Sequence, residues 1–473
     1  MKGRLNIFQT GMLRWRELYA YNAVHVVRVE APLARNRLEG VIEARLRALG
    51  LTGLTLDAAR GRYEYRGGPA HARLRVLPAG ADALPVVTRE IEIELNEAFP
   101  HDGAIDPFRF FAVDAGTHFH LGVAYDHFVA GGDSIVLLLK GLADAYVAPS
   151  SAATEQPLER YPATFRNFVF RHPWHVMQGM RHLRTSLATG RRAFRPRYPG
   201  GDDMRVGFTA LHFAPPEAAA FRGTAKRWDV TPNDLMIAIL LQALSPLAEG
   251  RRSAKRRKEI AIASVVNLRR DFDAPAATTF GQFLSSFHVT HPVPPGATLR
   301  ELAADVHAQS SAIREERRYY QTLIGISALN QILRFMSPER RTRFHMKSFP
   351  IWAGTTPVNV DAAWQEAGGN TFAPDYVRGV STGPLIPLVV AVTQAAGALN
   401  VGFTFRTAAF NPEDIDKMLT GIRDAFRCLR GDTGRPQTGV NETAAEAREA
   451  LVARSSSPRS GAATVAVRMG FAQ

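Results

Sequence analysis

Short apolar runs and one amphipathic stretch alternate along the first third of the chain. VHVVRVEA, from Val24, alternates like a β-strand, and ARNRLEGVIEARLRALG after it has a helical apolar period that Gly50 closes. REIEIELNEAF from Arg89, DPFRFFAVDAG from Asp106 and THFHLGVAYDH from Thr117 predict three more strands, and residues 134–146 predict a helix. The apolar face of the first helix is Leu38, Val41, Ile42, Leu46 and Leu49. This part of the chain is expected to be mixed α and β.

The second half starts with a strand-like run, VGFTALHF, and a helix opened by Pro-Pro-Glu. Thr231, with Asp234 three residues on, resembles a capping box, and the helix that follows is apolar enough to be buried. IAIASVVNLRRDF and FGQFLSSFHVTHPV read as strands, residues 385–406 as a hairpin, and NPEDIDKMLTGIRDAFRCLR as a closing amphipathic helix capped by Asn411.

A chain of 473 residues is too long for one ordinary core, so two domains are expected. Residues 171–205 are basic and end in Pro and Gly turn signals, as expected of a crossover between an N-terminal domain, 1–170, and a C-terminal one, 206–430. The Ser, Ala, Gly and Arg composition of residues 431–473 predicts a largely disordered tail.

The net charge of +14 attracts acidic partners, but its sign does not choose among nucleic acid, anionic lipid, nucleotide-bearing cofactors and acidic carrier proteins. Neither a zinc-finger spacing nor a strand of interleaved aromatic and basic residues is present, which disfavours nucleic acid. The run RRSAKRRKE, at 251–259, is interpreted as a solvated loop.

The longest apolar stretch, from Leu385, contains Pro, Gln and Asn, so no transmembrane helix is expected. The start of the chain lacks the features of a secretory signal, and the single cysteine, Cys428, cannot form an internal disulfide, which together favour a cytoplasmic location. Cys428 is expected to be a buried, inert thiol in the final helix. Four apolar residues of the crossover fall at helical spacing; burial is expected, with a helix lying on a lipid surface as the alternative. They are Trp174, Met177, Met180 and Leu183.

The segment AYDHFVAGGDSIVLLLKGLADAY, residues 124–146, carries the clearest chemistry. His127 follows a predicted strand, and Gly131 and Gly132 allow a tight turn before a helix that begins at Asp133 or Ser134. A neutral imidazole, with a pKa near about 6.5, can take a proton from a hydroxyl or an amine at neutral pH. On its own, a single histidine at the end of a strand would more often be structural.

This segment resembles the His-His-x-x-x-Asp-Gly motif of the chloramphenicol-acetyltransferase-like superfamily, which includes nonribosomal peptide condensation domains, wax ester synthases and polyketide-associated acyltransferases. In this alignment His127 matches the catalytic second histidine, Gly132 the glycine and Ser134 a frequent serine, while Asp126 replaces the first histidine and Gly131 the aspartate. The resemblance extends over residues 10–430: DVTPNDLMIAILLQAL, FGQFLSSF and TTPVNVDAAW are similar to segments that follow the motif in the same order.

The resemblance implies two similar α/β subdomains forming a V-shaped pseudo-dimer, with a tunnel between them. It also implies an acyltransferase in which His127 is the general base. The co-substrate would be an acyl thioester of coenzyme A or of an acidic phosphopantetheinyl carrier protein, and no cofactor would be tightly bound. Ser285 and Ser286 are candidates for the oxyanion site or the tunnel wall from their strand position. A monomeric state is also expected, whereas a peripheral contact with a membrane is a disfavoured alternative.

The family's aspartate pairs with an arginine, and Gly131 cannot; Asp133, two residues later, could cap the helix and accept that arginine. An Asp126 side chain that contacted a histidine would raise its basicity. The alternative is a catalytically degenerate, condensation-like protein that serves as a carrier-protein binding or scaffold module. His118 and His120 share a strand face, but no third ligand at a recognisable spacing indicates a metal site.

Overall fold

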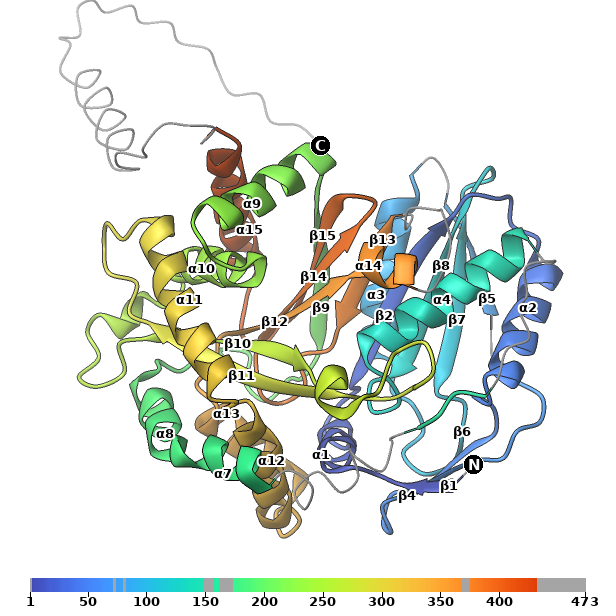
Figure 1. Cartoon of the computed structure of the whole chain (residues 1–473), viewed down its shortest axis with the longest axis horizontal. Helices are drawn as coiled ribbons and strands as arrows, with labels where there is room; N and C mark the ends of the chain where they lie inside the picture. Colours follow the sequence, from blue (N-terminus) through green and yellow to red (C-terminus); the bar gives the residue numbers. More distant parts are fainter. Residues whose placement is uncertain are drawn as a thin grey trace, which may run out of the picture.

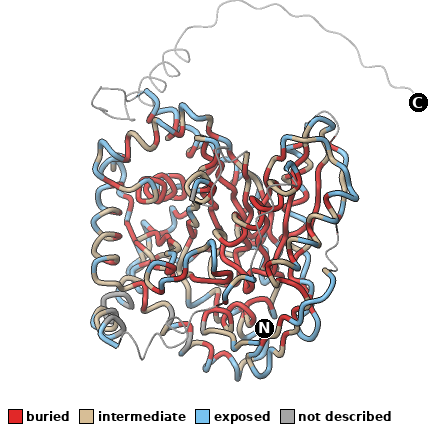
Figure 2. The backbone as a smooth tube through the Cα atoms, turned by 45° about the vertical axis from the view of Figure 1, so that its right-hand side comes forward, coloured by how far each residue is buried: buried red, intermediate tan, exposed pale blue. Residues whose placement is uncertain are grey.

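Three β-sheets organise the computed structural model, which describes residues 2–70, 74–79, 82–148, 157–160, 173–366 and 375–431. Two of the sheets form the centres of two lobes, seen at the right and the left of Figure 1, and the third is a small sheet beside the N-terminus. Buried residues follow the strands through both lobes in Figure 2. The expected α/β class and two-lobed architecture are confirmed.

The sheet of the first lobe has the order β13-β2-β8-β7-β5 and is covered on both faces. Because side chains alternate along a strand, Val24 and Val26 of β2 pack toward α3, while Ala23 and Val27 face the main core that includes α2 and α4. His25 shares the second face. The strands are β2 (Asn22–Val29), β5 (Leu74–Pro78), β7 (Phe108–Asp114), β8 (Phe119–Asp126) and β13 (Tyr376–Val380), and the helices are α2 (Arg35–Ala48), α3 (Ala83–Asn96) and α4 (Gly132–Val147).

The small antiparallel sheet has the order β1-β4-β3-β6 and lies near α1 in the lower part of Figure 1. Asn6 caps α1, because its side chain accepts from Gln9 N at 2.8 Å while the Gln9 side chain accepts from Asn6 N. This cap fixes the start of a helix that later forms one wall of the site. These elements are β1 (Lys2–Arg4), α1 (Ile7–Arg16), β3 (Leu54–Asp57), β4 (Arg62–Tyr65) and β6 (Gly103–Ile105).

The second lobe is built on a six-stranded sheet with the order β11-β10-β12-β14-β15-β9. The expected capping box at Thr231 and Asp234 is present, and α10 behind it is almost wholly buried among α9, α11 and α15. The predicted hairpin corresponds to β14 and β15, joined by Ala396 and Gly397, both at positive φ. The strands are β9 (Val206–Phe213), β10 (Ile260–Asn267), β11 (Leu284–His291), β12 (Ala353–Asn359), β14 (Leu388–Ala395) and β15 (Ala398–Arg406).

Helices surround this sheet and reach toward the first lobe. Residues 173–192 of the predicted crossover form two helices, in agreement with the helical spacing of its apolar residues. None of the described helices has the length and apolar character needed to cross a membrane. The helices are α7 (Pro173–Arg181), α8 (Leu183–Arg192), α9 (Pro215–Arg227), α10 (Pro232–Leu244), α11 (Leu299–Glu315), α12 (Tyr320–Leu333), α13 (Pro338–Ser348), α14 (Val360–Glu366) and α15 (Pro412–Gly431), with short 3-10 turns η2 (Glu249–Arg251) and η3 (Arg269–Phe272).

One strand crosses between the lobes. β13 follows β12 in the sequence, yet it pairs antiparallel with β2 at the edge of the first lobe's sheet and packs against β14 and β15 of the second. The sequence boundary at residue 206 therefore does not separate the two sheets cleanly. The predicted tail lies outside the described residues, apart from Gly431 at the end of α15.

Four expectations about local structure were wrong. The run from Arg89 is part of helix α3 rather than a strand: Val87, Ile91 and Leu95, four residues apart, are buried, whereas Ile93 is 40% exposed. Its period-two alternation was a coincidence within a helix rich in glutamate, a good helix former. The strand from Ile260 ends at Asn267, and the chain then turns through η3.

The other two expectations concern the exposure of Arg251 and the burial of Trp174 and Met177. The charge run at 251–259 is largely exposed, as expected, but its first residue is not: Arg251 is 1% exposed, and its guanidinium donates to Ser245, Ala248, Pro292 and Val293. Trp174 and Met177, expected to be buried, are 59% and 46% exposed. A charge run and a helical apolar spacing do not by themselves say which side chain turns inward.

Candidate active site

A cavity of about 780 Å³ lies between the lobes, where the predicted tunnel was expected. Its walls come from α1, from the turn between β8 and α4, and from β10, β11, β12 and β13, with α12 along one side. Most of its lining is apolar, including Phe8, Met12 and Trp15 of α1. A few polar side chains, among them His127, are presented from both lobes into this surface, as in many small-molecule sites.

His127 reaches the cavity from the turn after β8, and its main-chain N–H donates to Tyr21 O at 3.1 Å. The imidazole is flanked by the rings of Tyr21 and Tyr125, with centroids at 5.3 and 5.9 Å. Burial lowers the pKa of His127 to about 4, with a smaller contribution from the positive charge of Arg378, while a hydrogen bond with the backbone of Ala130 opposes them. At neutral pH the ring is therefore uncharged and can accept a proton.

Gln282, just before β11, holds the histidine from the second lobe. Its Nε2 donates to the carbonyl of His127 at 2.7 Å and lies 3.2 Å from the ring Nδ1. An amide nitrogen can only donate, so this orientation makes Nδ1 an acceptor and leaves the ring proton on Nε2; the reverse orientation would place the amide oxygen against the His127 carbonyl oxygen, where two acceptors repel. Gln282 therefore selects the tautomer of His127 as well as its position.

Asp126 turns away from His127. Its carboxylate pairs with Arg16 of α1 in a contact where both side chains are buried, and Arg16 also donates to Pro100 O. Burial raises the pKa of Asp126, and Arg16 opposes this rise. The groups that shift the pKa of His127 do not include Asp126. The expected rise in histidine basicity needed a contact that the Asp126 side chain does not make. Its contact joins β8 to α1 instead.

Asp133 takes the place of the motif carboxylate. Its Oδ2 accepts from Arg269 Nε and from Asn267 Nδ2, so the first lobe is tied to the second by the arginine contact expected for this residue. A Cβ at Gly131 would lie 3.1 Å from Asp133 Oδ1 and 3.3 Å from Gln282 Oε1. The carboxylate thus fills the space beside Gly131, which explains in steric terms why this position can be glycine.

The start of α4 differs slightly from the expectation. Gly131, rather than Asp133 or Ser134, is its N-cap and provides no side chain, while Asp133 lies in the first turn and accepts from Ser134 N at 3.0 Å. Ser134 Oγ accepts from Arg269 Nη2 at 2.6 Å, and Arg269 Nη1 donates to Ala274 O and Thr279 O. Arg269 therefore has all its nitrogens engaged in holding this turn.

The two serines of β11 both line the cavity but differ in their contacts. Ser285 is buried, and its hydroxyl donates to Tyr319 O, so its proton is already used within the protein. Ser286 points to the opposite face of the strand and is only partly buried. Of the two proposed oxyanion donors, Ser286 stays a prediction, whereas Ser285 would first have to give up its bond to Tyr319.

Several polar residues of the cavity wall were not identified from the sequence, among them His25, Gln282 and Arg378. The first and last stand in otherwise apolar strands, and a charged or polar residue in such a strand is the signal that could have drawn attention to them. His25 Nδ1 lies 2.8 Å from the hydroxyl of Tyr376, and burial holds its pKa well below the usual value. Gln282 carries no comparable signal, because its loop has no regular pattern.

The remaining candidates lie outside the cavity. Cys428 is exposed, so the expectation of a buried thiol was wrong; it occupies the polar face of α15, whose buried positions are neighbours such as Phe426 and Leu429. His118 and His120 have ring centroids 5.6 Å apart, and no group of three metal-binding side chains is found within the described residues.

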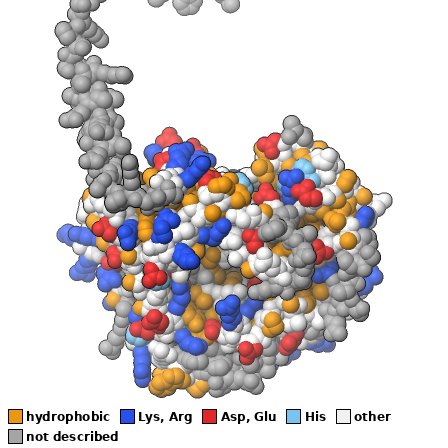
Figure 3. Space-filling model, turned by 45° about the horizontal axis from the view of Figure 1, so that its top comes forward, with side chains coloured by type: hydrophobic (Ala, Val, Ile, Leu, Met, Phe, Trp, Pro, Cys, Tyr) orange, Lys and Arg blue, Asp and Glu red, His pale blue; other side chains and the backbone are white. Residues whose placement is uncertain are grey.

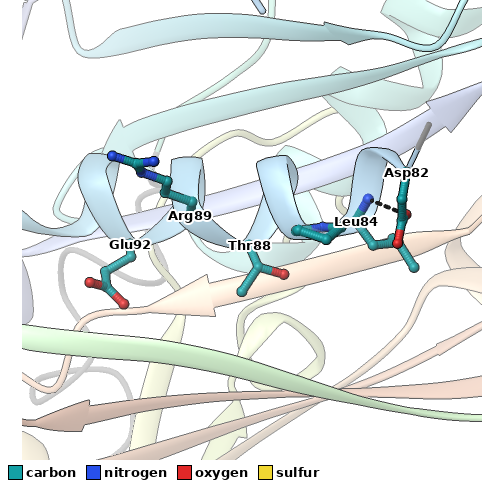
Figure 4. Close-up of a pocket in the computed structure, with 6 residues that line it drawn as sticks. Asp82, Leu84, Thr88, Arg89 and Glu92 are labelled. Carbon is teal, nitrogen blue, oxygen red and sulfur yellow. Dashed lines mark hydrogen bonds between the residues drawn. The ribbon is translucent and has the colours of Figure 1, made fainter. Parts of the chain in front are cut away.

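A second hollow, of about 530 Å³, lies on the outer side of α3 (Figure 4). Its residues run along one side of the helix from Asp82, which caps it through Leu84 N at 3.0 Å, to Thr88 and Glu92. It is open to solvent and has no histidine or thiol in its lining. Glu92 Oε2 accepts from Phe208 N, so this side of α3 serves to cover the edge strand β9.

Exposed apolar side chains occur on two helices that pack together. α7 packs against α12, and His182, just after α7, lies 3.2 Å from Glu316, which precedes α12. Trp174 and Met177 of α7 are exposed, and at the C-terminal end of α12 Ile332 is 54% and Phe335 80% exposed. Ile332 also lines the cavity. Lys and Arg side chains are numerous on the left-hand lobe in Figure 3, where the outline also dips between the lobes.

Comparison with solved structures identifies the fold. The condensation domain of the Monacolin K polyketide synthase MokA is similar over 91% of this chain and 98% of its own, with a TM-score of 0.65 at 12% identity. The first condensation domain of the CDA synthetase (TM-score 0.64, 15% identity, 92% and 97% covered) and the X-domain from teicoplanin biosynthesis (0.56, 17%, 91% and 96%) are also similar. No protein-family model and no curated relative matches the chain. The chain has the condensation-domain fold, which confirms the resemblance at that level.

Proposed function

We propose that this protein is an acyltransferase of the condensation type, which moves an acyl group from a thioester to a hydroxyl or an amine. One observation carries the proposal: a buried, neutral histidine stands in a cavity with walls from both lobes. The fold is compatible with this activity, since condensation domains share it. Because a fold hosts different functions, the argument rests on the site.

The proposed reaction needs no covalent enzyme intermediate. The basic nitrogen of His127 takes the proton of the acceptor as its oxygen or nitrogen attacks the thioester carbonyl. The carbon–sulfur bond then breaks, and the imidazolium returns the proton to the departing thiolate, so that charge and protons balance. Gln282 holds His127 by donating to its carbonyl, and the Asp133–Arg269 pair holds the turn that carries it.

The donor is proposed to be an acyl thioester of coenzyme A or of a phosphopantetheinyl carrier protein. Both carry phosphate, and a carrier protein of acidic surface would be drawn to a chain of net charge +14. Secondary metabolism and lipid synthesis both use such donors. The cavity, reached by elements from each lobe, is large enough to hold the two reacting ends of a donor and an acceptor together.

The test is thiol release from a panel of acyl-CoA and acyl-carrier thioesters offered with mixed alcohols and amines, with product masses recorded. His127→Ala should reduce turnover by at least about 100-fold while leaving the fold intact. His118→Ala, which alters a histidine outside the cavity, is the matched control and should leave turnover within about threefold. Equal turnover in the wild type and the His127 variant would remove the base role.

A scaffold function is the alternative, and the lost aspartate at Gly131 favours it. The X-domain from teicoplanin biosynthesis has the same fold and is described in complex with OxyB, so this fold also binds other proteins. A scaffold predicts that a carrier protein binds equally well to the wild type and to the His127→Ala variant, and that no thioester is consumed by either. Consumption that depends on His127 would exclude it.

A lipid-surface enzyme is a second candidate, favoured by the exposed Trp174, Met177, Ile332 and Phe335, of which Ile332 lines the cavity. Arg181 lies over the Trp174 ring and Arg334 over the Phe335 ring, so cations flank apolar side chains as in proteins that bind anionic membranes. When phosphatidylglycerol vesicles are sedimented at low salt, the wild type should be found in the pellet with the vesicles and the Trp174→Ser/Phe335→Ser variant in the supernatant. Equal sedimentation of the two would dismiss the idea.

A further inference from the structure

Arg378, on the strand that crosses between the lobes, is a buried cation without a carboxylate partner. It is 1% exposed and lines the cavity. Its Nε donates to Thr393 Oγ1 at 2.9 Å, and its Nη2 donates to Thr356 O at 2.6 Å and Val392 O at 3.0 Å. These contacts fix the guanidinium plane but are all to neutral oxygens, and within the described residues no acidic group forms an ion pair with it.

The other buried arginines show that this arrangement is unusual for the chain. Arg16 pairs with Asp126 and Arg269 with Asp133. Arg251 has no carboxylate either, but each of its three nitrogens donates to protein oxygens and it lies away from the cavity. Arg160 and Arg406 also have no carboxylate partner among the described residues, and the Nε of each has no acceptor there, but neither lines the cavity. Of these six buried arginines in the described part of the chain, Arg378 is the one that lines the cavity and has a nitrogen, Nη1, for which the described residues provide no acceptor.

Nη1 faces the space above Gly132. A Cβ at Gly132 would lie 3.2 Å from Nη1 and 3.5 Å from His25 Cε1, so the absence of a side chain there leaves room beside the guanidinium. Arg378 also lowers the pKa of both His25 and His127, which shows that its charge acts on the groups around the reaction centre. Both histidines are neutral at pH 7, and neither neutralises the cation.

We propose that Arg378 Nη1 binds a carboxylate carried by one of the two substrates, in the space that Gly132 leaves open. This inference rests on the proposed acyl transfer and adds a substrate class to it: a dicarboxylic acyl donor or an amino-acid acceptor. Leaving a charge buried without a counter-ion is costly, and an incoming carboxylate would supply the missing partner through a charge-assisted hydrogen bond.

A carboxylate fits the position better than a phosphate. In a pantetheine donor the phosphate is separated from the thioester by the whole pantetheine arm, whereas Arg378 acts directly on the histidine that would meet the thioester carbonyl. The anion must therefore be on the acyl group or on the acceptor, close to the reacting atoms. The two sources share one chemistry, and the experiment can separate them.

The test is calorimetric titration of the full-length protein at low salt with two matched pairs of unreactive probes. The donor pair is S-(3-carboxypropyl)pantetheine, a thioether that cannot transfer an acyl group, and its primary amide. The acceptor pair is L-leucine and L-leucinamide, without any thioester present. In one pair the carboxylate should bind about 10- to 100-fold more tightly than the amide, the range expected for a hydrogen bond to a charged group. That pair identifies the source.

Arg378→Gln should reduce this preference to about one, and Arg378→Lys should retain part of it. Because Arg378→Gln could also loosen the packing of β13, Gly132→Ala is the second variant: it leaves the guanidinium contacts and places a methyl group beside Nη1. It should abolish the preference with an unchanged thermal midpoint. Arg300→Gln, which removes an exposed positive charge from α11, should leave the preference as in the wild type.

The inference is overturned if neither carboxylate binds better than its amide, or if the preference survives both Arg378→Gln and Gly132→Ala. A loss of turnover in Arg378→Gln without any carboxylate preference in the wild type would assign Arg378 to the oxyanion of the reaction intermediate instead, and would equally overturn it. Acyl transfer is judged separately: a carboxylate preference without any thiol release from thioesters would leave the anion site standing and refute the proposed activity.

Discussion

Two substitutions together would move the anchoring carboxylate from position 133 to position 131. Asp133→Asn removes the charge that pairs with Arg269, whose side chain is 7% exposed. Breaking a buried pair costs about 3–5 kcal/mol. Arg269 keeps its bonds to Ser134, Ala274 and Thr279, and Asp133 is 21% exposed, so solvent screens part of the loss. We expect Asp133→Asn to lower the free energy of unfolding by about 2 kcal/mol.

Gly131→Asp alone should also destabilise the protein. The new Cβ would lie 3.1 Å from Asp133 Oδ1, which brings two carboxylates to a separation of about 4 Å. Like charges at that distance repel by about 4 kcal/mol at an effective dielectric constant of 20, and the partial exposure of Asp133 reduces this to about 2 kcal/mol. In the double variant Gly131→Asp/Asp133→Asn the repulsion is gone and Arg269 regains an acidic partner.

The double variant should therefore be about as stable as either single variant or more so, a departure from additivity of at least about 2 kcal/mol. Urea unfolding measures the stabilities, and hydrogen–deuterium exchange of residues 126–138 reports the turn itself. Asp424→Asn, which breaks an exposed pair with Arg427, is the control and should change stability by less than about 1 kcal/mol. If Asp133→Asn costs no more than this control and the double variant is additive, the carboxylate at Asp133 does not anchor the turn.

Three further predictions concern the histidine and its neighbours. Folding lowers the pKa of His127 from 6.5 to about 4, so between pH 6.5 and pH 4 the unfolded chain binds a proton that the folded chain does not. The free energy of unfolding should therefore drop over that window by up to roughly 3 kcal/mol. Urea unfolding of the His127→Gln variant should show a correspondingly smaller drop. Gln282→Glu places a carboxylate against the ring and should raise the pKa that limits kcat/KM at acid pH by about 1–3 units; an unmoved acid limb would contradict the contact. Ser285→Ala should leave turnover within about threefold, because its hydroxyl donates to Tyr319 O, and a 100-fold loss would restore it as an oxyanion donor.

The sequence predicted the features that depend on local rules. The capping box of α10 needs only Thr231 and Asp234 three residues apart, and the turn at His127 needs only glycines between a strand and a helix. The segment of α3 was misread as a strand because Ile91, Ile93 and Leu95 stand at every second position. The residues that are buried in the helix are selected by its packing against β9 and the first lobe's sheet. Local patterns do not contain that partner.

The contacts of the site depend on partners that lie far away in the sequence. Asp126 was expected to raise the basicity of any histidine that it contacted, but its partner is Arg16, 110 positions earlier in the chain. Gln282 meets His127 from 155 positions later. Which arginine meets which carboxylate depends on how the lobes are brought together, and an isolated sequence does not give that arrangement. Only the contact of Asp133 with an arginine could be anticipated, because a lost charge implies a nearby replacement.

The crossing of β13 explains why the site contains both a base and an unpaired cation. His127 and His25 come from the first lobe, where the sheet is apolar and holds them neutral; Arg378 is brought beside them by a strand from the second half of the sequence, anchored to oxygens of β12 and β14. A neutral base next to a fixed positive charge remains unprotonated over a wide pH range, since protonation would place two cations together in a buried space. The same charge that keeps the base ready also leaves one position in the cavity that a substrate anion can fill. Separating the lobes would remove both properties at once, so the composition of this site requires the two halves in one chain or in one complex.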